Sequence, residues 1–364
     1  MVLLTLGALF CRTFWRVATV DPGFDVTHTV MATVWRPAGP RLPDREAWSW
    51  RDGVVRRVKE IPGVIGVTSI GTLPFMGELP QDSIGRNGDS VDAYSMGAGE
   101  QFCQVLGISI LRGRDFEIAD RTRQPVPALV NQTLARRLFG SADPLGAELQ
   151  VGRERKRVLR IVGVIADTRM RTLGEDRAPM FFTPYHDTQM IVRTAGDAAH
   201  WIEPIRNALS KTDTGSALDI RPLSEAAAGV IFPMRVAAAF VGSMSGVGLV
   251  LALSGLYSSV SYATRRRTRE MAIRVAVGAT GAEIVWTAIR DGVAVLACGV
   301  AAGLPLAVLA IRPLTALLPD GLDPWNPPMF VAVAVLLLAT GAAAAWIPAS
   351  TAASVDPSGV LRQD

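Results

Sequence analysis

The chain has 364 residues, of which 49% are hydrophobic and 19% charged, and its mean hydropathy is positive. These values exclude an ordinary soluble domain and favour a membrane protein with one sizeable domain outside the lipid. The formal net charge of +4 comes mostly from arginine. Because this is a compositional bias, it does not indicate a nucleic-acid partner.

The first apolar stretch, residues 1–11, is too short to cross a bilayer, since a hydrocarbon core of ~30 Å needs ~20 apolar residues. It also lacks the basic residues that begin a secretory signal. We expect it to be the remnant of a first transmembrane helix. A truncation, a late start codon and a split gene are equally compatible with the sequence.

Residues 12–235 are expected to form a folded extracytoplasmic α+β domain. Two β-α-β units bracket it, each with an apolar strand, a helix-patterned segment and a second strand. Their elements are expected at residues 28–35, 44–60 and 63–71, and at residues 190–194, 197–210 and 217–223. Two such units predict a ferredoxin-like split core.

An insertion of about residues 75–187 separates the two units. Within it, residues 123–140 predict a strand followed by a short helix that ends at Gly140. A further strand is predicted from apolar residues at Val158, Ile161 and Val164. The insertion is where specificity for a partner protein or substrate would be sought.

Three later segments, at about residues 236–263, 292–311 and 329–348, are long and apolar enough to span a membrane. The first contains Gly242 and Gly246 in the G-x-x-x-G spacing that allows close helix packing. The alternative is that a sequence rich in alanine and glycine produces this spacing by chance. The centres of the spans carry no ionisable residue, which disfavours an ion-coupled carrier or a channel.

The arginines predict the orientation. The loop after the first full span is rich in arginine, whereas the loop after the second has only Arg312. Short loops rich in arginine stay in the cytoplasm, so residues 12–235 are expected on the outer side. The cytoplasmic loop contains Arg265, Arg266, Arg267, Arg269 and Arg274.

No catalytic motif is found. None of the three lysines belongs to a G-x-x-x-x-G-K-[ST] phosphate loop, so we expect no ATPase activity in this chain. The histidines, His28, His186 and His200, are scattered and predict no metal site. Asp115, Glu117 and Asp120 lie among arginines, and we interpret them as local ion pairs and turn caps rather than catalytic carboxylates.

Several motifs resemble FtsX/MacB-type ABC transporter permeases, in order along nearly the whole chain. They are "TVDPGFDVTHTVMATV", "GRDFEIAD", "VNQTLARRLFGSADPLGAEL", "RIVGVIADTRM", "RRRTREMAIRVAVGATGAEIV" and "AASVDPSGVLR". The resemblance implies a MacB-like periplasmic core domain and an FtsX-like membrane domain with four helices per subunit. It also implies a dimer in the bacterial inner membrane, or one half of a duplicated orphan permease.

The resemblance further implies that residues 265–280 form a coupling segment that docks on a separate ABC ATPase, which binds the ATP. Wound as a helix, the segment places Arg266, Glu270 and Arg274 on one stripe and an apolar stripe beside it. The alternative is a basic segment that lies on anionic lipid. The expected coupling residues are Arg266, Arg267, Glu270, Met271, Arg274, Val275 and Gly278.

Two functions remain open on the sequence. The first is the permease of an ATP-driven exporter of a drug, peptide or lipoprotein. The second is a mechanotransmitter that moves no cargo and regulates an envelope protein such as a cell-wall hydrolase. Expected partners are the ATPase, a second permease subunit, membrane lipids and a periplasmic protein, and no cofactor is expected on the chain itself.

Overall fold

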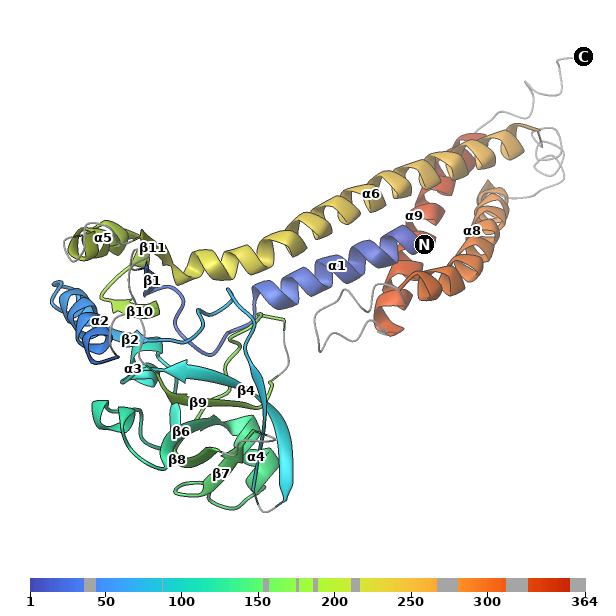
Figure 1. The fold of residues 1–364 in the computed structure, drawn as a ribbon. Helices are drawn as coiled ribbons and strands as arrows, with labels where there is room; N and C mark the ends of the chain where they lie inside the picture. Colours follow the sequence, from blue (N-terminus) through green and yellow to red (C-terminus); the bar gives the residue numbers. More distant parts are fainter. Residues whose placement is uncertain are drawn as a thin grey trace, which may run out of the picture. The chain divides into compact units, whose positions relative to one another are not determined.

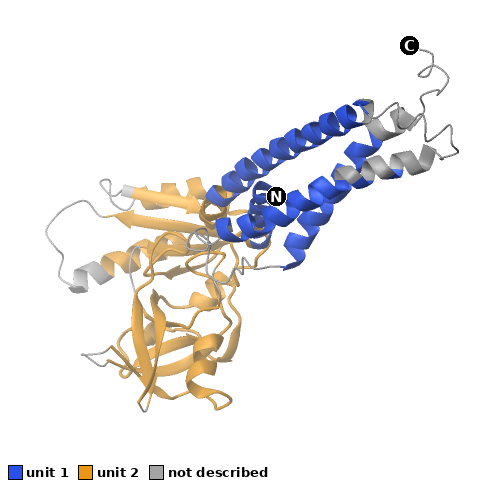
Figure 2. Cartoon of the chain, turned by 90° about the vertical axis from the view of Figure 1, so that its right-hand side faces the viewer, with its two compact units in different colours: residues 1–16, 233–364 blue, residues 17–232 orange. Residues whose placement is uncertain are grey.

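The chain divides into two compact units, one of residues 1–16 and 233–364 and one of residues 17–232 (Figure 2). The division falls a few residues before the boundary at 235/236 expected from the sequence. The computed structural model describes residues 1–35, 44–86, 88–152, 157–174, 177–185, 189–210, 217–266, 281–311 and 327–353.

The 17–232 unit contains a four-stranded sheet in the order β11-β1-β10-β2, with every neighbouring pair antiparallel. Helix α2 connects the first two strands in the chain, and the short helices η2 and α5 connect the last two, as the sequence predicts. The elements are β1 (Thr29–Trp35), α2 (Asp44–Lys59), β2 (Val64–Ser69), β10 (Gln189–Thr194), η2 (Ala198–Trp201), α5 (Ile202–Ser210) and β11 (Ala217–Pro222).

Both faces of this sheet are buried. Alternate residues of β1 point to opposite faces. Val30 and Val34 pack in one apolar cluster with Val58 of α2 and Ile205 of α5, whereas Met31 belongs to a second cluster on the other face. The two helices therefore cover one face of the sheet (Figure 1).

The insertion forms a seven-stranded sheet that closes on itself. The order is β5-β8-β6-β9-β4-β3-β7, and β7 also pairs with β8, so six of the described strands form a ring with β5 at its margin. Apolar side chains from all six ring strands share one core. The strands are β3 (Gln81–Arg86), β4 (Asp89–Ala98), β5 (Ile110–Gly113), β6 (Val126–Asn131), β7 (Glu148–Val151), β8 (Arg157–Ile165) and β9 (Met180–Pro184).

The predicted short helix is present as α4 (Gln132–Phe139), and it ends at Gly140 with φ of 59°. On β8 the prediction was right for Ile161 and Val164, which are buried, and wrong for Val158, which is 39% exposed. The spacing of three between the buried residues has a physical cause. A bulge where β8 pairs with Ala128 and Leu129 of β6 adds one residue and reverses the alternation.

The other unit is helical, with α1 (Val2–Ala18), α6 (Leu223–Arg266), α8 (Gly281–Ile311) and α9 (Pro327–Ala353); the first ten residues of α6 belong to the 17–232 unit. Helix α1 continues beyond residue 11 and includes Arg12 and Arg16. Within the described ranges, three helical stretches are long and apolar enough to cross a membrane: Leu223–Ala263, Val293–Ala310 and Pro327–Ile347. The protein is therefore a membrane protein.

Candidate functional site

The predicted coupling residues fall almost entirely outside the described part of the chain. Arg266 is the last residue of α6, and its side chain is exposed. Arg267, Glu270, Met271, Arg274, Val275 and Gly278 lie in residues 267–280, which the structure does not describe. Docking of an ATPase on this segment stays a prediction.

Gly242 and Gly246, the glycines predicted to pack against another helix, lie close to a contact between α1 and α6 that their G-x-x-x-G spacing did not indicate. A Cβ on Gly242 would lie 4.0 Å from Cys11 Sγ, and a Cβ on Gly246 would meet no described atom within 4 Å. Helix α1 instead approaches α6 at Ser245, whose Oγ lies 2.6 Å from the carbonyl oxygen of Leu3. A Cβ on Gly7 would lie 2.6 Å from the same Oγ, so a small residue on each helix allows this approach.

Helix α6 is built directly into the core of the 17–232 unit. Strand β11 ends at Pro222 and α6 begins at the next residue, Leu223. The side chain of Leu223 is fully buried in a cluster with Phe182 of the ring, and Ala226 packs against the same cluster. No flexible linker separates the sheet from the helix.

The segment that follows α1 is fastened to the same core. Phe24 belongs to that cluster, and the backbone N–H of Asp25 donates to Leu106 O at 2.8 Å. The Asp25 carboxylate accepts from the backbone and ring of His28 and pairs with Arg193 at 3.4 Å. Burial alone would raise the pKa of Asp25, but the hydrogen bonds that its carboxylate accepts from His28 and from the Thr27 N–H lower it below its ordinary value.

The acidic residues among the arginines form the ion pairs and caps predicted from the sequence. Asp120 is buried and accepts two hydrogen bonds from Arg114, at 2.6 and 2.9 Å. Asp115 accepts from backbone N–H groups at the start of α3 (Phe102–Leu106). Glu117 and Asp120 form a capping box on the 3₁₀ helix η1 (Ile118–Arg121).

Arg121 connects separate parts of the unit. Its guanidinium pairs with Asp52 of α2 and with Glu100, both at 3.0 Å. Elsewhere, His28 pairs with Asp25, His200 lies in η2, and His186 is outside the described residues. In the described ranges, no three His, Cys, Asp or Glu side chains gather as a metal site would require.

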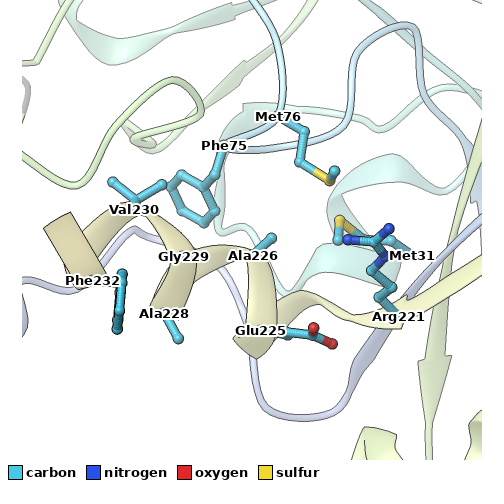
Figure 3. A pocket seen from close by; sticks show the side chains of 10 residues that line it. All are labelled: Met31, Phe75, Met76, Arg221, Glu225, Ala226, Ala228, Gly229, Val230 and Phe232. Atoms are coloured by element: carbon cyan, nitrogen blue, oxygen red, sulfur yellow. The ribbon is translucent and has the colours of Figure 1, made fainter.

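An open pocket of about 580 Å³ lies where α6 begins (Figure 3). One wall is the first turns of α6, including Val230 and Phe232, and the other contains Phe75 and Met76 from the segment between β2 and β3. Arg221 and Glu225 stand at its rim. The sequence gives no local signal of this pocket, because its walls come from segments about 150 residues apart.

Two known protein families match two successive parts of the chain. A family model described as "MacB-like periplasmic core domain" matches residues 17–216, more than half of the chain. A second, "FtsX-like permease C-terminal", matches residues 242–357. The chain belongs to the FtsX/MacB-type permease family. Residues 217–241, which carry the α6 wall of the pocket, lie between the two matches.

Individual relatives are similar to this permease over most of its length. "Macrolide export ATP-binding/permease protein MacB" of Neisseria meningitidis serogroup A is 23% identical over 300 residues, covering 77% of this chain and 45% of the relative. "Pyoverdine export ATP-binding/permease protein PvdT" of Pseudomonas entomophila is 24% identical over 329 residues, covering 83% and 49%. The permease therefore spans about half the length of the curated relatives it matches.

Among solved structures, the periplasmic region of MacB from Actinobacillus actinomycetemcomitans aligns with 57% of this permease and 94% of that chain. The sequence identity is 16% and the TM-score 0.40.

Proposed function

We propose that this permease is the membrane subunit of an ATP-driven export system in which a separate ABC ATPase binds and hydrolyses ATP. In this proposal the helical unit lies in the bacterial inner membrane, the 17–232 unit faces the periplasm, and two permease subunits act together. The chain needs no cofactor of its own. The cargo is a drug, a peptide or a lipoprotein. Two of the relatives are named for the export of macrolides and of pyoverdine, which supports export of this kind.

The ATPase docks on residues 265–280 in this proposal. Arg266, Glu270 and Arg274 would meet the groove of the ATPase along one stripe of a short helix. The same arginines hold the loop in the cytoplasm. The segment would then serve both as a topology signal and as the contact through which the ATPase moves the membrane helices.

The direct attachment of α6 to the outer domain carries the proposal. Because Leu223 is buried in the core one residue after β11 ends, no linker at this junction would absorb a movement of the first turns of α6. Such a movement would be passed to the sheet and the ring. The same attachment would serve a mechanotransmitter that moves no cargo, which remains the alternative.

The test is co-purification of the tagged chain with the ATPase encoded nearest to it. The charge reversals Glu270→Arg and Arg274→Glu are expected to release the ATPase, because each places a like charge in the docking stripe. Arg206→Glu, on the exposed surface of α5, is the matched control and should retain it. Retention by both reversals, or absence of the ATPase from the wild type, would contradict the docking proposal.

A further inference from the structure

The pocket at the start of α6 has the size and lining of a site for a small amphiphile. Its volume of about 580 Å³ lies within the range of ~300–1,000 Å³ that small-molecule sites occupy. Met31 and Met76 contribute thioether side chains, which adapt to ligands of different shape. Phe75 and Phe232 contribute aromatic rings, which bury large apolar surfaces.

One wall of the pocket is held in place before any ligand arrives. Phe75 has φ of 65°, a left-handed conformation that is strained for a bulky residue. Its backbone N–H donates to Met170 O at 2.9 Å, and its ring stacks on Phe24 with centroids 5.8 Å apart. The strained backbone therefore presents this part of the segment in a fixed position.

Two large apolar side chains of the lining are not covered by the rest of the described chain. Phe232 is 64% exposed, and Met76 is 49% exposed. Exposed apolar side chains around a hollow are typical of ligand sites. An apolar group bound in the pocket would cover part of this surface.

The rim of the pocket carries one basic and one acidic side chain, Arg221 and Glu225. Arg221 donates from Nε to Asp219 at 2.7 Å, and no other hydrogen bond of its guanidinium is found among the described residues. Figure 3 shows the guanidinium directed toward the Met31 side chain, whereas the Glu225 carboxylate points away from Phe75. The remaining N–H groups of Arg221 are thus placed to donate to a ligand.

We propose that this pocket binds an acidic amphiphile, whose apolar ring or chain lies between Phe75, Met76 and Val230 and whose carboxylate, phosphate or sulfonate pairs with Arg221. Glu225 opposes the same head group by charge repulsion and so limits the affinity. The proposal concerns binding alone, so its failure would leave the proposed coupling to an ATPase untouched.

Two fluorescent probes that differ only in charge test the proposal. Anilinonaphthalene sulfonate carries an acidic group, and N-phenylnaphthylamine has the same aromatic skeleton without it. Each is titrated against the full chain in phosphatidylcholine nanodiscs, with empty nanodiscs as the background. Arg221→Gln is expected to weaken binding of the sulfonate by about tenfold or more, the value of a lost charge-assisted hydrogen bond, and to leave the neutral probe unchanged.

Two further variants sharpen the test. Glu225→Gln should strengthen binding of the sulfonate, because it removes the opposing charge. Ala228→Trp should weaken both probes, because an indole would occupy the pocket that Ala228 lines. Arg206→Gln, an exposed arginine of α5 that also pairs with a carboxylate, is the matched control and should change neither.

Three results would overturn the proposal. If Ala228→Trp leaves both probes unchanged, neither binds in this pocket. If Arg221→Gln affects the two probes equally, the acidic group is not recognised. If Arg221→Gln strengthens and Glu225→Gln weakens the sulfonate, the pocket selects the opposite charge. Displacement of the sulfonate from the wild type by dodecyl phosphate, but not by dodecanol, tests the same claim without any variant.

The natural source of the amphiphile can be a membrane lipid or a soluble compound, and nanodiscs that also contain phosphatidylglycerol separate these. Loss of the Arg221-dependent signal in such nanodiscs supports a lipid head group as the ligand. Retention of the signal supports a soluble acidic amphiphile. Either result is consistent with the shared chemistry of an apolar group joined to an acid.

Discussion

Asp120 is a buried carboxylate, and its contribution to the stability of the folded state depends on Arg114. Its side chain is fully buried and lies 2.6 Å from the guanidinium of Arg114. Burial raises the pKa of Asp120, but the hydrogen bonds from Arg114 and from the Glu117 N–H, together with the nearby positive charges, lower it below its ordinary value of 3.8. Ionised Asp120 therefore favours the folded state above this value, and the contribution is lost as the pH falls through the folded-state pKa.

We expect Asp120→Asn to lower the free energy of unfolding at neutral pH by about 2 kcal/mol, the contribution of hydrogen bonds to a charged group. The loss should shrink as the pH falls below 3.8 and through the lower folded-state pKa of Asp120, because the wild-type carboxylate becomes protonated there. Thermal unfolding of the full chain in detergent, followed by tryptophan fluorescence, measures both effects.

Arg123→Gln is the control for this prediction. Arg123 also pairs with Asp120, at 3.3 Å, but its side chain is 54% exposed, so its loss should cost less than about 1 kcal/mol. An equal loss in the two variants would show that the exposed pair with Arg123, and not the bidentate bond from Arg114, carries the contribution of Asp120.

At the scale of the helices, the contact between α1 and α6 depends on a residue without a side chain. A Cβ on Gly7 would lie 2.6 Å from Ser245 Oγ, whereas a Cβ on Gly246 would meet nothing described within 4 Å. We expect Gly7→Val to destabilise the helical unit by about 1–3 kcal/mol, since the helices must separate. Gly246→Val is the matched control.

Thermal melting of the two glycine variants in nanodiscs is the measurement. A lower melting temperature for Gly7→Val alone is the expected result. A comparable drop for Gly246→Val would indicate that another helix packs against Gly246, as its G-x-x-x-G spacing predicts, and would contradict its use as a neutral position.

The junction between β11 and α6 makes a second prediction at this scale. Insertion of two glycines between Pro222 and Leu223 should leave ATP hydrolysis by the complex intact and abolish its transport, because a flexible linker would absorb the movement of α6. The same insertion after Gly196, in an open turn where a Cβ would meet nothing within 4 Å, should preserve both activities. Transport by the junction variant would disprove mechanical transfer through this connection.

At the scale of the whole molecule, the arginine-rich loop predicts the orientation of the chain. With Cys11 and Cys298 replaced by serine, and Cys103 buried, a cysteine at Arg269 should react with an impermeant maleimide only after the membrane is opened. A cysteine at Ser141, which is exposed on the outer domain, should react in intact spheroplasts. The reverse pattern would place the 17–232 unit in the cytoplasm.

The sequence predicted the elements whose signals are local. The helix before Gly140, both β-α-β units and the capping box of Glu117 and Asp120 depend on residues close together in the chain, where propensity and spacing are informative. The buried alternation of β8 was only partly predicted, because the bulge between Ile161 and Gly163, which brings Val164 to the buried face, depends on pairing with a distant strand.

The pocket and the α1–α6 contact were not predictable in this way. Nothing in the local sequence marks Phe75 for a left-handed conformation, which usually requires glycine. Ser245 is one of several small residues on α6, and only the position of Gly7 selects it. Such sites arise where segments distant in sequence meet, and one sequence taken by itself carries no signal of that meeting.

The closed ring of the insertion also has a mechanical consequence. Within the described strands, each of the six ring strands pairs with a neighbour on both sides. None of them therefore has an unpaired edge from which strand separation could start. Amide protons in the ring should therefore exchange with solvent far more slowly than those of β5 at its margin. A structure that resists shear in this manner would respond as one rigid body wherever a load is applied.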